Sequence, residues 1–289
     1  MPPDDVSDAR AQQSPAAVVA ALDARAERIA TPCGNGSLIW RRWGNGRALI
    51  LLHGGYGSWT HWLRNIEPLA ARYSVLACDL PGLGDSADAP KPYSAESLAA
   101  IVAEGIARVA PDESVAMCGF SFGAVIGGHV AAQMGTTIES FLMLGAAGLG
   151  GERRPLALTR VEPGMTLAQI AEVQRGNLIK LMFGNATRVD ELAVHLQNEN
   201  TRRGRMDSRS IAFTDTLVHT LPKASARLGA IWGEQDATAA GAIGQNFTVL
   251  RKLKPGIYCD TIADAGHWAQ WEQPALFEKK LTAFIEGKV

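Results

Sequence analysis

A serine flanked by glycines stands where a buried strand gives way to a helix. The residues Gly119-Phe120-Ser121-Phe122-Gly123 fit the pattern G-x-S-x-G, with an apolar run from Ser114 before it and helical spacing after it. A sharp strand–turn–helix corner strains its central residue and exposes that side chain, and small flanking residues let strand and helix approach closely. The pattern therefore predicts Ser121 as a nucleophile, against the alternative of a glycine-rich loop with an incidental serine.

A serine hydroxyl is a poor nucleophile unless a base, most often a histidine, removes its proton. His267 follows the last buried strand, and loops at the carboxyl ends of parallel strands are where open α/β sheets bind ligands. We predict His267 as the base. Four other histidines have ordinary interpretations as packed, solvated or loop-shaping residues: His53, His129, His195 and His219.

The base needs a carboxylate on its other ring nitrogen, which orients the imidazole. Asp236 follows the buried strand that precedes the strand before His267, and we predict it in this role. Glu234 and Asp264 are nearby alternatives, which we interpret as loop carboxylates.

Attack on a carbonyl also requires hydrogen-bond donors for the oxyanion that forms. One donor is expected from the backbone amide after the nucleophile, that of Phe122. The second is expected from the loop after the strand that ends at His53-Gly54-Gly55, where the Gly55 amide is the best candidate. Each such donor typically lowers the barrier by about 3 kcal/mol.

Alternating strands and helices are expected to position these residues. Two strands over 27–33 and 37–43 precede a series of buried runs separated by helical segments: 48–55, 74–80, 113–120, 138–147, 228–236 and 256–267. This alternation predicts βαβ units and a mostly parallel sheet. Between about Gly150 and Pro222 the alternation stops and the spacing is helical, which predicts a helical insertion.

Composition excludes several function classes. The chain has 289 residues, of which 47% are hydrophobic, and a net charge of −1. That balance argues against nucleic acid or an anionic membrane surface as a partner. The four cysteines form no CxxC pair and are interpreted as buried free thiols, while the polar N-terminus is unlike a secretory signal, so a cytoplasmic protein is expected. No metal-ligand cluster or G-x-G-x-x-G after a first strand occurs, so no cofactor is predicted.

Together these residues resemble the α/β-hydrolase family over about 27–286. The matching pieces, in family order, are His53-Gly54-Gly55, the run Asp79–Ser86, the serine motif, Trp232-Gly233-x-x-Asp236 and Gly266-His267. The resemblance implies an α/β fold whose eight-stranded, mostly parallel sheet is flanked by helices, with a helical cap after strand six. It divides the chain into an N-terminal extension (1–26), a core (27–149 and 223–289) and a cap or lid (150–222). A serine nucleophile separates it from the haloalkane dehalogenase and epoxide hydrolase branches, which use aspartate.

A narrower resemblance is to meta-cleavage product hydrolases, which split a carbon–carbon bond in dienoates from aromatic degradation. It rests on the segments Gly266–Glu272, Leu144–Gly150 and Ser58–Asn65. Two asparagines of those enzymes are replaced here by Phe120 and His61, and their glycine-proline-glycine loop is shortened to Gly55-Tyr56-Gly57. The resemblance implies a substrate pocket lined by Tyr56, His61 and Phe120. Trp268, beside the base, is expected either to line that pocket or to pack between cap and core.

The leading hypothesis is a cofactor-independent serine hydrolase that forms an acyl-enzyme with a small-molecule carbonyl substrate. C–C bond hydrolysis and carboxylesterase or lactonase activity both remain open, as does, more remotely, a non-catalytic small-molecule binding protein. Four cap arginines are either substrate-carboxylate ligands or a solvated helix face: Arg202, Arg203, Arg205 and Arg209. The sequence leaves open whether the chain forms a homo-oligomer.

Overall fold

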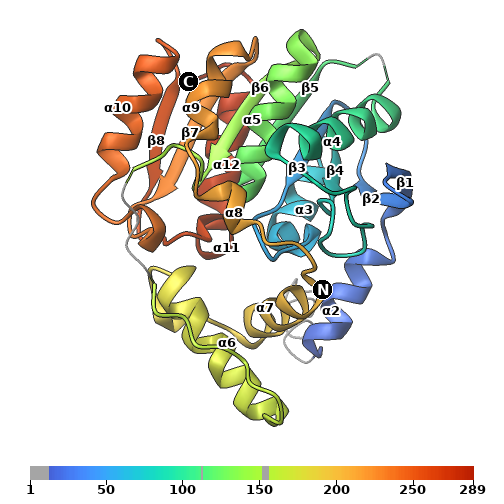
Figure 1. Cartoon of the computed structure of the whole chain (residues 1–289), viewed down its shortest axis with the longest axis vertical. Coiled ribbons are helices and arrows are strands. Elements are labelled where there is room, and N and C mark those ends of the chain that lie inside the picture. The colour runs from blue at the N-terminus through green and yellow to red at the C-terminus, as the bar shows by residue number, and fades with distance from the viewer. Residues whose placement is uncertain (1–12, 112, 152–155) are drawn as a thin grey trace, which may run out of the picture.

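The computed structural model describes residues 13–111, 113–151 and 156–289 and contains an eight-stranded sheet (Figure 1). The strands are β1 (Glu27–Cys33), β2 (Gly36–Trp43), β3 (Ala48–Leu52), β4 (Ser74–Cys78), β5 (Val115–Phe120), β6 (Ile138–Leu144), β7 (Arg227–Gly233) and β8 (Tyr258–Ile262). Their order is β1-β2-β4-β3-β5-β6-β7-β8. The pairings β1–β2 and β2–β4 are antiparallel, and all others are parallel. The α/β fold class predicted from the sequence is confirmed.

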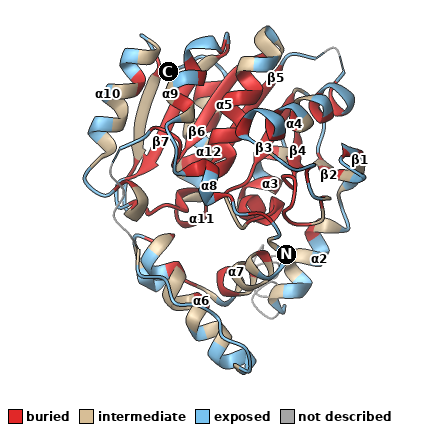
Figure 2. Ribbon diagram, in the orientation of Figure 1, coloured by how far each residue is buried: buried red, intermediate tan, exposed pale blue. Residues whose placement is uncertain are grey.

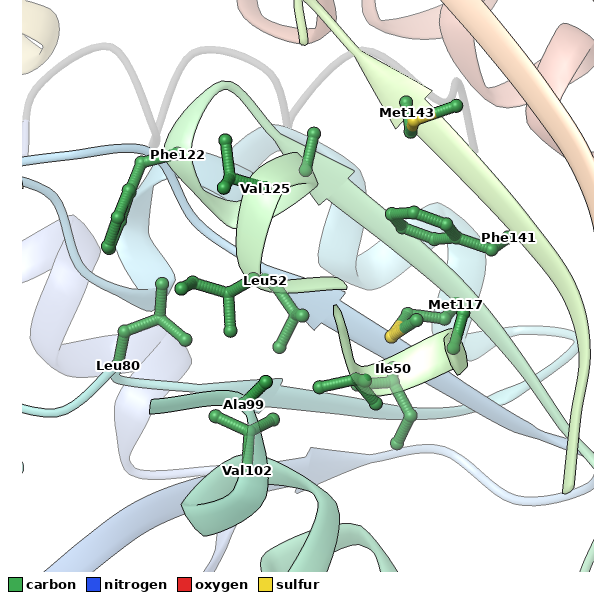
Figure 3. Close-up of a cluster of buried hydrophobic side chains, with 14 of the residues drawn as sticks. Ile50, Leu52, Leu80, Ala99, Val102, Met117, Phe122, Val125, Phe141 and Met143 are labelled. Carbon is green, nitrogen blue, oxygen red and sulfur yellow. The ribbon is translucent and has the colours of Figure 1, made fainter. Parts of the chain in front are cut away.

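Helices cover both faces of the sheet, so the central strands are buried on both sides. Successive residues of β3 alternate between two cores: Ile50 and Leu52 belong to one, Leu49 and Leu51 to the other. The first core lies under α4 (Ala95–Val109), α5 (Phe122–Met134) and α10 (Ile243–Leu253), and Figure 3 shows part of it. The second lies under α3 (Leu63–Ala70) and α12 (Pro274–Ile285). This double burial explains why the strands read as continuous apolar runs.

Local signals set the beginnings of several helices. The Ser94 hydroxyl accepts a hydrogen bond from the Ser97 amide and the Ser97 hydroxyl accepts one from the Ser94 amide, which forms a capping box at the start of α4. The N-terminal helix α2 (Pro15–Asp23) begins with a proline at its first position, where the missing N–H costs nothing. Residues 1–12, on which the expectation of no secretory signal rests, lie outside the described residues, so the predicted extension is described only from residue 13.

From Leu167 on, the segment between β6 and β7 is mainly helical, with four α-helices among its described residues. They are α6 (Leu167–Leu181), α7 (Glu191–Arg203), α8 (Arg209–Ala212) and α9 (Thr216–Thr220). In Figure 1, α6 and α7 lie apart from the helices that cover the sheet, and Figure 2 shows that α6 is mostly exposed or half-buried. We use the word cap for the described part of residues 150–222. None of the helices within 13–111, 113–151 and 156–289 is long and apolar enough to cross a membrane.

The four cysteines are free thiols. Cys33, Cys78 and Cys118 are buried, whereas Cys259 is half-buried.

Candidate active site

Ser121 lies at a strained corner between β5 and α5. Its φ is +52° and its ψ −111°, a conformation that costs a non-glycine residue about 1–3 kcal/mol. Its neighbours must be small, because a Cβ on Gly119 would stand 2.4 Å from the Gly123 carbonyl oxygen, and a Cβ on Gly123 would stand 2.3 Å from the Leu52 oxygen. The corner is anchored by a 2.8 Å hydrogen bond from the Ser121 amide to the Leu144 carbonyl of β6. A strained strand-to-helix corner of this kind presents the hydroxyl of its central serine to a substrate.

His267 and Asp236 are hydrogen-bonded to each other. His267 Nδ1 lies 2.7 Å from Asp236 Oδ2, and both side chains are buried. The other oxygen of the carboxylate, Oδ1, accepts hydrogen bonds from the Thr238 amide (2.8 Å) and hydroxyl (2.7 Å). Burial opposes ionisation of Asp236, but the charge and hydrogen bond of His267 and the hydrogen bonds from Thr238 outweigh it, so its pKa is below the ordinary value. The carboxylate therefore stays ionised and can hold His267 with Nδ1 protonated, leaving Nε2 free to accept a proton.

The His267 ring lies against the residues that flank Ser121 in the chain and in the sheet. Its centroid is 4.9 Å from that of Phe120, the residue before Ser121. A Cβ on Gly145 would stand 3.0 Å from the ring's Cε1 and Nδ1 atoms, and Gly145 directly follows the Leu144 carbonyl that binds the Ser121 amide. The structure thus brings the predicted nucleophile, base and carboxylate to the same edge of the sheet.

Gly55 and Phe122, the predicted oxyanion donors, are also neighbours. A Cβ on Gly55 would stand 3.7 Å from the Cβ of Phe122. The side chain of Phe122 is buried in the first core, and Figure 3 shows it beside Val125, Leu52 and Leu80. That packing fixes the backbone from which its amide would donate.

The predicted pocket residues Phe120, His61 and Trp268 form an aromatic group beside His267. The His61 ring centroid is 5.4 Å from that of Phe120 and 5.1 Å from that of Trp268. His61 Nδ1 accepts a 3.2 Å hydrogen bond from the Gly54 amide. Burial, and then the nearby imidazoles His53 and His267, hold the pKa of His61 well below its ordinary value. His61 is therefore neutral, with its proton on Nε2.

Trp268 packs between the cap and the core. Its indole Nε1 donates to the His61 carbonyl at 2.9 Å, and its amide donates to the carbonyl of Met182 in the cap at 2.8 Å. Its ring lies 6.1 Å from that of Phe183, a second cap residue. The side chain is 1% exposed, as a packing role requires.

The remaining predicted pocket residue, Tyr56, and the cap arginines all have partners within the protein. Tyr56 has a φ of +49°, and its hydroxyl donates to Asp207 Oδ1 at 3.2 Å. Each arginine forms an ion pair: Arg202 with Glu199, Arg203 with Asp85, Arg205 with Asp88, and Arg209 with Asp207. These pairs hold the arginines on the protein itself, so a substrate carboxylate would have to displace one of these partners.

The alternative carboxylates lie elsewhere. Glu234 accepts a 3.1 Å hydrogen bond from the Thr261 hydroxyl, and Asp264 pairs with Arg188. Of the histidines set aside above, His53 accepts a 2.9 Å hydrogen bond from the Leu80 amide at Nε2, and thereby links the loops after β3 and β4. His129 binds the Thr216 hydroxyl at 2.8 Å, which joins α5 to α9.

Sequence reasoning missed two residues that position the site. Thr238 holds the Asp236 carboxylate, and the spacing Asp-x-Thr, typical of a side chain that caps its own turn, was the available signal. Glu272 is buried, and its carboxylate accepts from the amides of Gly184 (2.9 Å), Asn185 (3.0 Å) and Gly266 (2.6 Å). Glu272 thereby links the cap to the loop that carries His267. No local sequence pattern predicts a contact between segments so far apart in the chain.

An ion-pair network around buried Arg41 joins the cap to the core. Asp85 Oδ2 lies 2.5 Å from Arg41 Nη2 and 3.0 Å from Arg28 Nη2, and Oδ1 binds Arg203 of the cap. Arg41 is 2% exposed. Burial raises the pKa of Asp85. The hydrogen bond from Arg41 and the charges of the three arginines lower it by more, so the pKa lies below its ordinary value. The stabilisation that follows is present above about pH 4 and is lost as the pH falls through the lowered pKa.

Replacing Asp85 with asparagine is expected to lower the free energy of unfolding by about 2 kcal/mol at pH 7, because buried Arg41 loses an anionic partner. The matched control, Asp88→Asn, removes an exposed partner of Arg205 and should cost less than about 1 kcal/mol. Urea unfolding at pH 7 and near pH 3 measures both variants. The Asp85→Asn deficit should shrink in acid, and a deficit that is the same at both pH values would contradict the account.

Comparison with known proteins adds a family match. The model of the alpha/beta hydrolase family matches residues 49–280. The chain is 27% identical to the dihydrolipoyllysine-residue acetyltransferase component of the acetoin cleaving system of Cupriavidus necator, an alignment that covers 86% of this chain and 66% of that protein. It is 28% identical to 2-hydroxy-6-oxononadienedioate/2-hydroxy-6-oxononatrienedioate hydrolase 1 of Dechloromonas aromatica, over 82% of this chain and 86% of that protein.

Solved structures share the fold. The carboxylesterase CesB of Bacillus subtilis aligns with a TM-score of 0.75 at 19% identity, and the alignment covers 98% of this chain and 99% of that chain.

Proposed function

Because the chain belongs to the alpha/beta hydrolase family, we propose that it is a cofactor-independent serine hydrolase in which Ser121 attacks a substrate carbonyl. The observation that carries this proposal is the 2.7 Å hydrogen bond between His267 and Asp236, beside a serine held at φ +52°. A base oriented by a buried carboxylate next to a strained, half-exposed serine is the arrangement that nucleophilic catalysis by serine requires.

In the proposed reaction, His267 Nε2 accepts the Ser121 proton as the oxygen attacks the carbonyl carbon. The amides of Gly55 and Phe122 stabilise the oxyanion of the tetrahedral intermediate. The intermediate collapses when His267 returns the proton to the leaving group, which leaves an acyl-enzyme on Ser121. A water molecule, deprotonated by His267, then attacks the acyl carbon and releases the carboxylic acid. Asp236 remains ionised throughout and stabilises the imidazolium in each half-reaction.

Two substrate classes have specific support. Relatives named 2-hydroxy-6-oxononadienedioate/2-hydroxy-6-oxononatrienedioate hydrolase align over four-fifths or more of the chain. They favour cleavage of a carbon–carbon bond in a vinylogous diketo acid. In that class the dienol must first become a ketone, and we propose that His267 moves that proton as well. Carboxylic ester or lactone hydrolysis is favoured by a different observation. The cap arginines Arg202, Arg203, Arg205 and Arg209 form internal ion pairs, which suits an uncharged substrate.

Turnover of two substrates by the purified protein separates these classes. One substrate is a short p-nitrophenyl ester, and the other is a 2-hydroxy-6-oxo-dienoate ring-fission product, whose visible absorbance disappears on cleavage. Rapid loss of the dienoate would assign the enzyme to the C–C hydrolases, whereas ester cleavage alone would assign it to the esterases or lactonases. Turnover of either substrate by Ser121→Ala at the wild-type rate would overturn the proposal for that class.

A further inference from the structure

A short stretch of the cap, residues 204–209, lies on the loop that holds the predicted oxyanion donor Gly55. A Cβ on Gly204 would stand 2.9 Å from the Tyr56 ring. Asp207 Oδ1 accepts the Tyr56 hydroxyl hydrogen bond, and the guanidinium carbon of Arg209 lies 5.5 Å from the centre of the same ring. Tyr56, the residue after Gly55, is thus held on three sides by the cap.

Within this stretch, Ser208 is the residue closest to the oxyanion donors. Its Oγ is 2.3 Å from the point where a Cβ on Gly55 would stand, and the Phe122 Cβ is 3.7 Å from that same point. A side-chain hydroxyl from the cap therefore lies beside Gly55, which in turn neighbours Phe122, the other residue whose amide is proposed to bind the oxyanion. Gly55 has to be a glycine here because a methyl group would occupy the place of this hydroxyl.

The Ser208 residue is almost entirely buried, and its hydroxyl has no hydrogen-bond partner among the described residues. The residue is 2% exposed, and it precedes α8 without capping it. No hydrogen bond to its Oγ occurs among residues 13–111, 113–151 and 156–289. Two positions along, the exposed Ser210 does use its hydroxyl, which donates to the Asp207 carbonyl at 2.9 Å. The hydroxyl of an almost fully buried residue is normally hydrogen-bonded, so one that lacks a partner at a reaction site points to a group on the substrate.

We propose that Ser208 is a third oxyanion donor, carried by the cap, whose hydroxyl binds the substrate carbonyl oxygen as Ser121 attacks it. The inference rests on the proposed function, because it assumes that the oxyanion forms between Gly55 and Phe122. A hydrogen bond to the oxyanion is stronger than one to the ground-state carbonyl, so Ser208 acts mainly on the rate of the chemical step. It also follows that the oxyanion site is complete only when residues 204–209 are docked on the core.

The test compares Ser208→Ala with Ser210→Ala, which removes the neighbouring exposed hydroxyl. The two readouts are kcat and KM on a p-nitrophenyl ester, and the second-order rate at which a fluorophosphonate labels Ser121. The labelling rate depends on stabilising charge on a phosphoryl oxygen at the same site and needs no turnover. We expect Ser208→Ala to lower kcat and the labelling rate about 10- to 100-fold, with little change in KM, and Ser210→Ala to stay within about two-fold of wild type. Thermal unfolding midpoints show whether each variant is folded.

Each outcome separates this inference from the proposed function. In one outcome the wild type is labelled, Ser121→Ala is not, and Ser208→Ala is labelled as fast as Ser210→Ala. This result overturns the role of Ser208 and leaves the serine hydrolase intact. A Ser208→Ala variant faster than wild type also overturns it, because the hydroxyl would then obstruct the site. A folded wild-type protein that neither labels nor cleaves the ester overturns both. A loss confined to KM would assign Ser208 to ground-state binding and contradict the donor role.

Discussion

Replacing Ser121 with alanine is expected to lower kcat/KM by about 10⁴- to 10⁶-fold on whichever carbonyl substrate the enzyme accepts. The substitution removes the only atom proposed to form the covalent intermediate, while the strained backbone at φ +52° and the anchoring hydrogen bond to Leu144 remain. Steady-state kinetics on a p-nitrophenyl ester and on a ring-fission dienoate measure the effect. The free energy of unfolding should change by less than about 1 kcal/mol, because only one half-exposed hydroxyl is lost.

The background rate decides how this result is interpreted. Residual activity near 10³-fold above the uncatalysed reaction would be consistent with oxyanion binding alone. A folded Ser121→Ala protein with more than about a tenth of the wild-type rate would contradict a serine nucleophile.

Replacing Asp236 with asparagine is expected to lower kcat about 10⁴-fold. The carboxylate holds His267 with its proton on Nδ1, 2.7 Å away. An asparagine at this position can present its amide N–H to Nδ1 instead, and the imidazole then carries its proton on Nε2, where it cannot accept one from Ser121. Kinetics at pH 7 and 9 measure the loss, which higher pH should not restore because the tautomer, not the charge, is wrong.

Glu234→Gln is the matched control for this prediction. Glu234 lies two residues earlier, is exposed, and accepts a hydrogen bond from Thr261. Its replacement should leave kcat within about two-fold of wild type. Equal losses in the two variants, or a larger loss in Glu234→Gln, would show that the orienting carboxylate has been assigned to the wrong residue.

Much of the sheet was predictable because its strands are buried on both faces. β3 and β5 alternate their side chains between two cores, so both positions of the alternation must be apolar, and the runs are visible without any alignment. Ser121 was predictable for a related reason. It has a glycine two positions away on each side, at the point where an apolar run ends and helical spacing begins. These glycines are needed because β5 and α5 approach each other closely in the structure.

The cap contacts were not predictable, because they join residues distant in sequence. The charge run from Arg202 to Arg209 is equally compatible with a solvated face, a carboxylate site and ion pairs to the core, and only the fold selects the pairs with Asp85 and Asp88. The four-residue helix α11 (Ala269–Glu272) was also missed. It is too short for a periodic signal, and it is held by the hydrogen bonds of Glu272 to backbone amides rather than by its own propensity.

The oxyanion environment shows the same limit. Gly55 and Phe122 could be predicted as oxyanion donors because one follows a strand end and the other follows the serine. Ser208 belongs to the cap, about 150 residues further along the chain, and contacts Gly55 only in the folded structure. No spacing rule relates these residues, so only the packed structure can place this hydroxyl.

Mass spectrometry of the protein after reaction with a fluorophosphonate tests the central claim most directly, because it needs no knowledge of the substrate. The account predicts one added phosphonyl group, located on Ser121 by peptide mapping, with no addition to Ser121→Ala and much slower addition to His267→Ala. A folded wild-type protein that remains unlabelled, or one labelled at another residue, would contradict it and favour a non-catalytic small-molecule binding protein built on this fold.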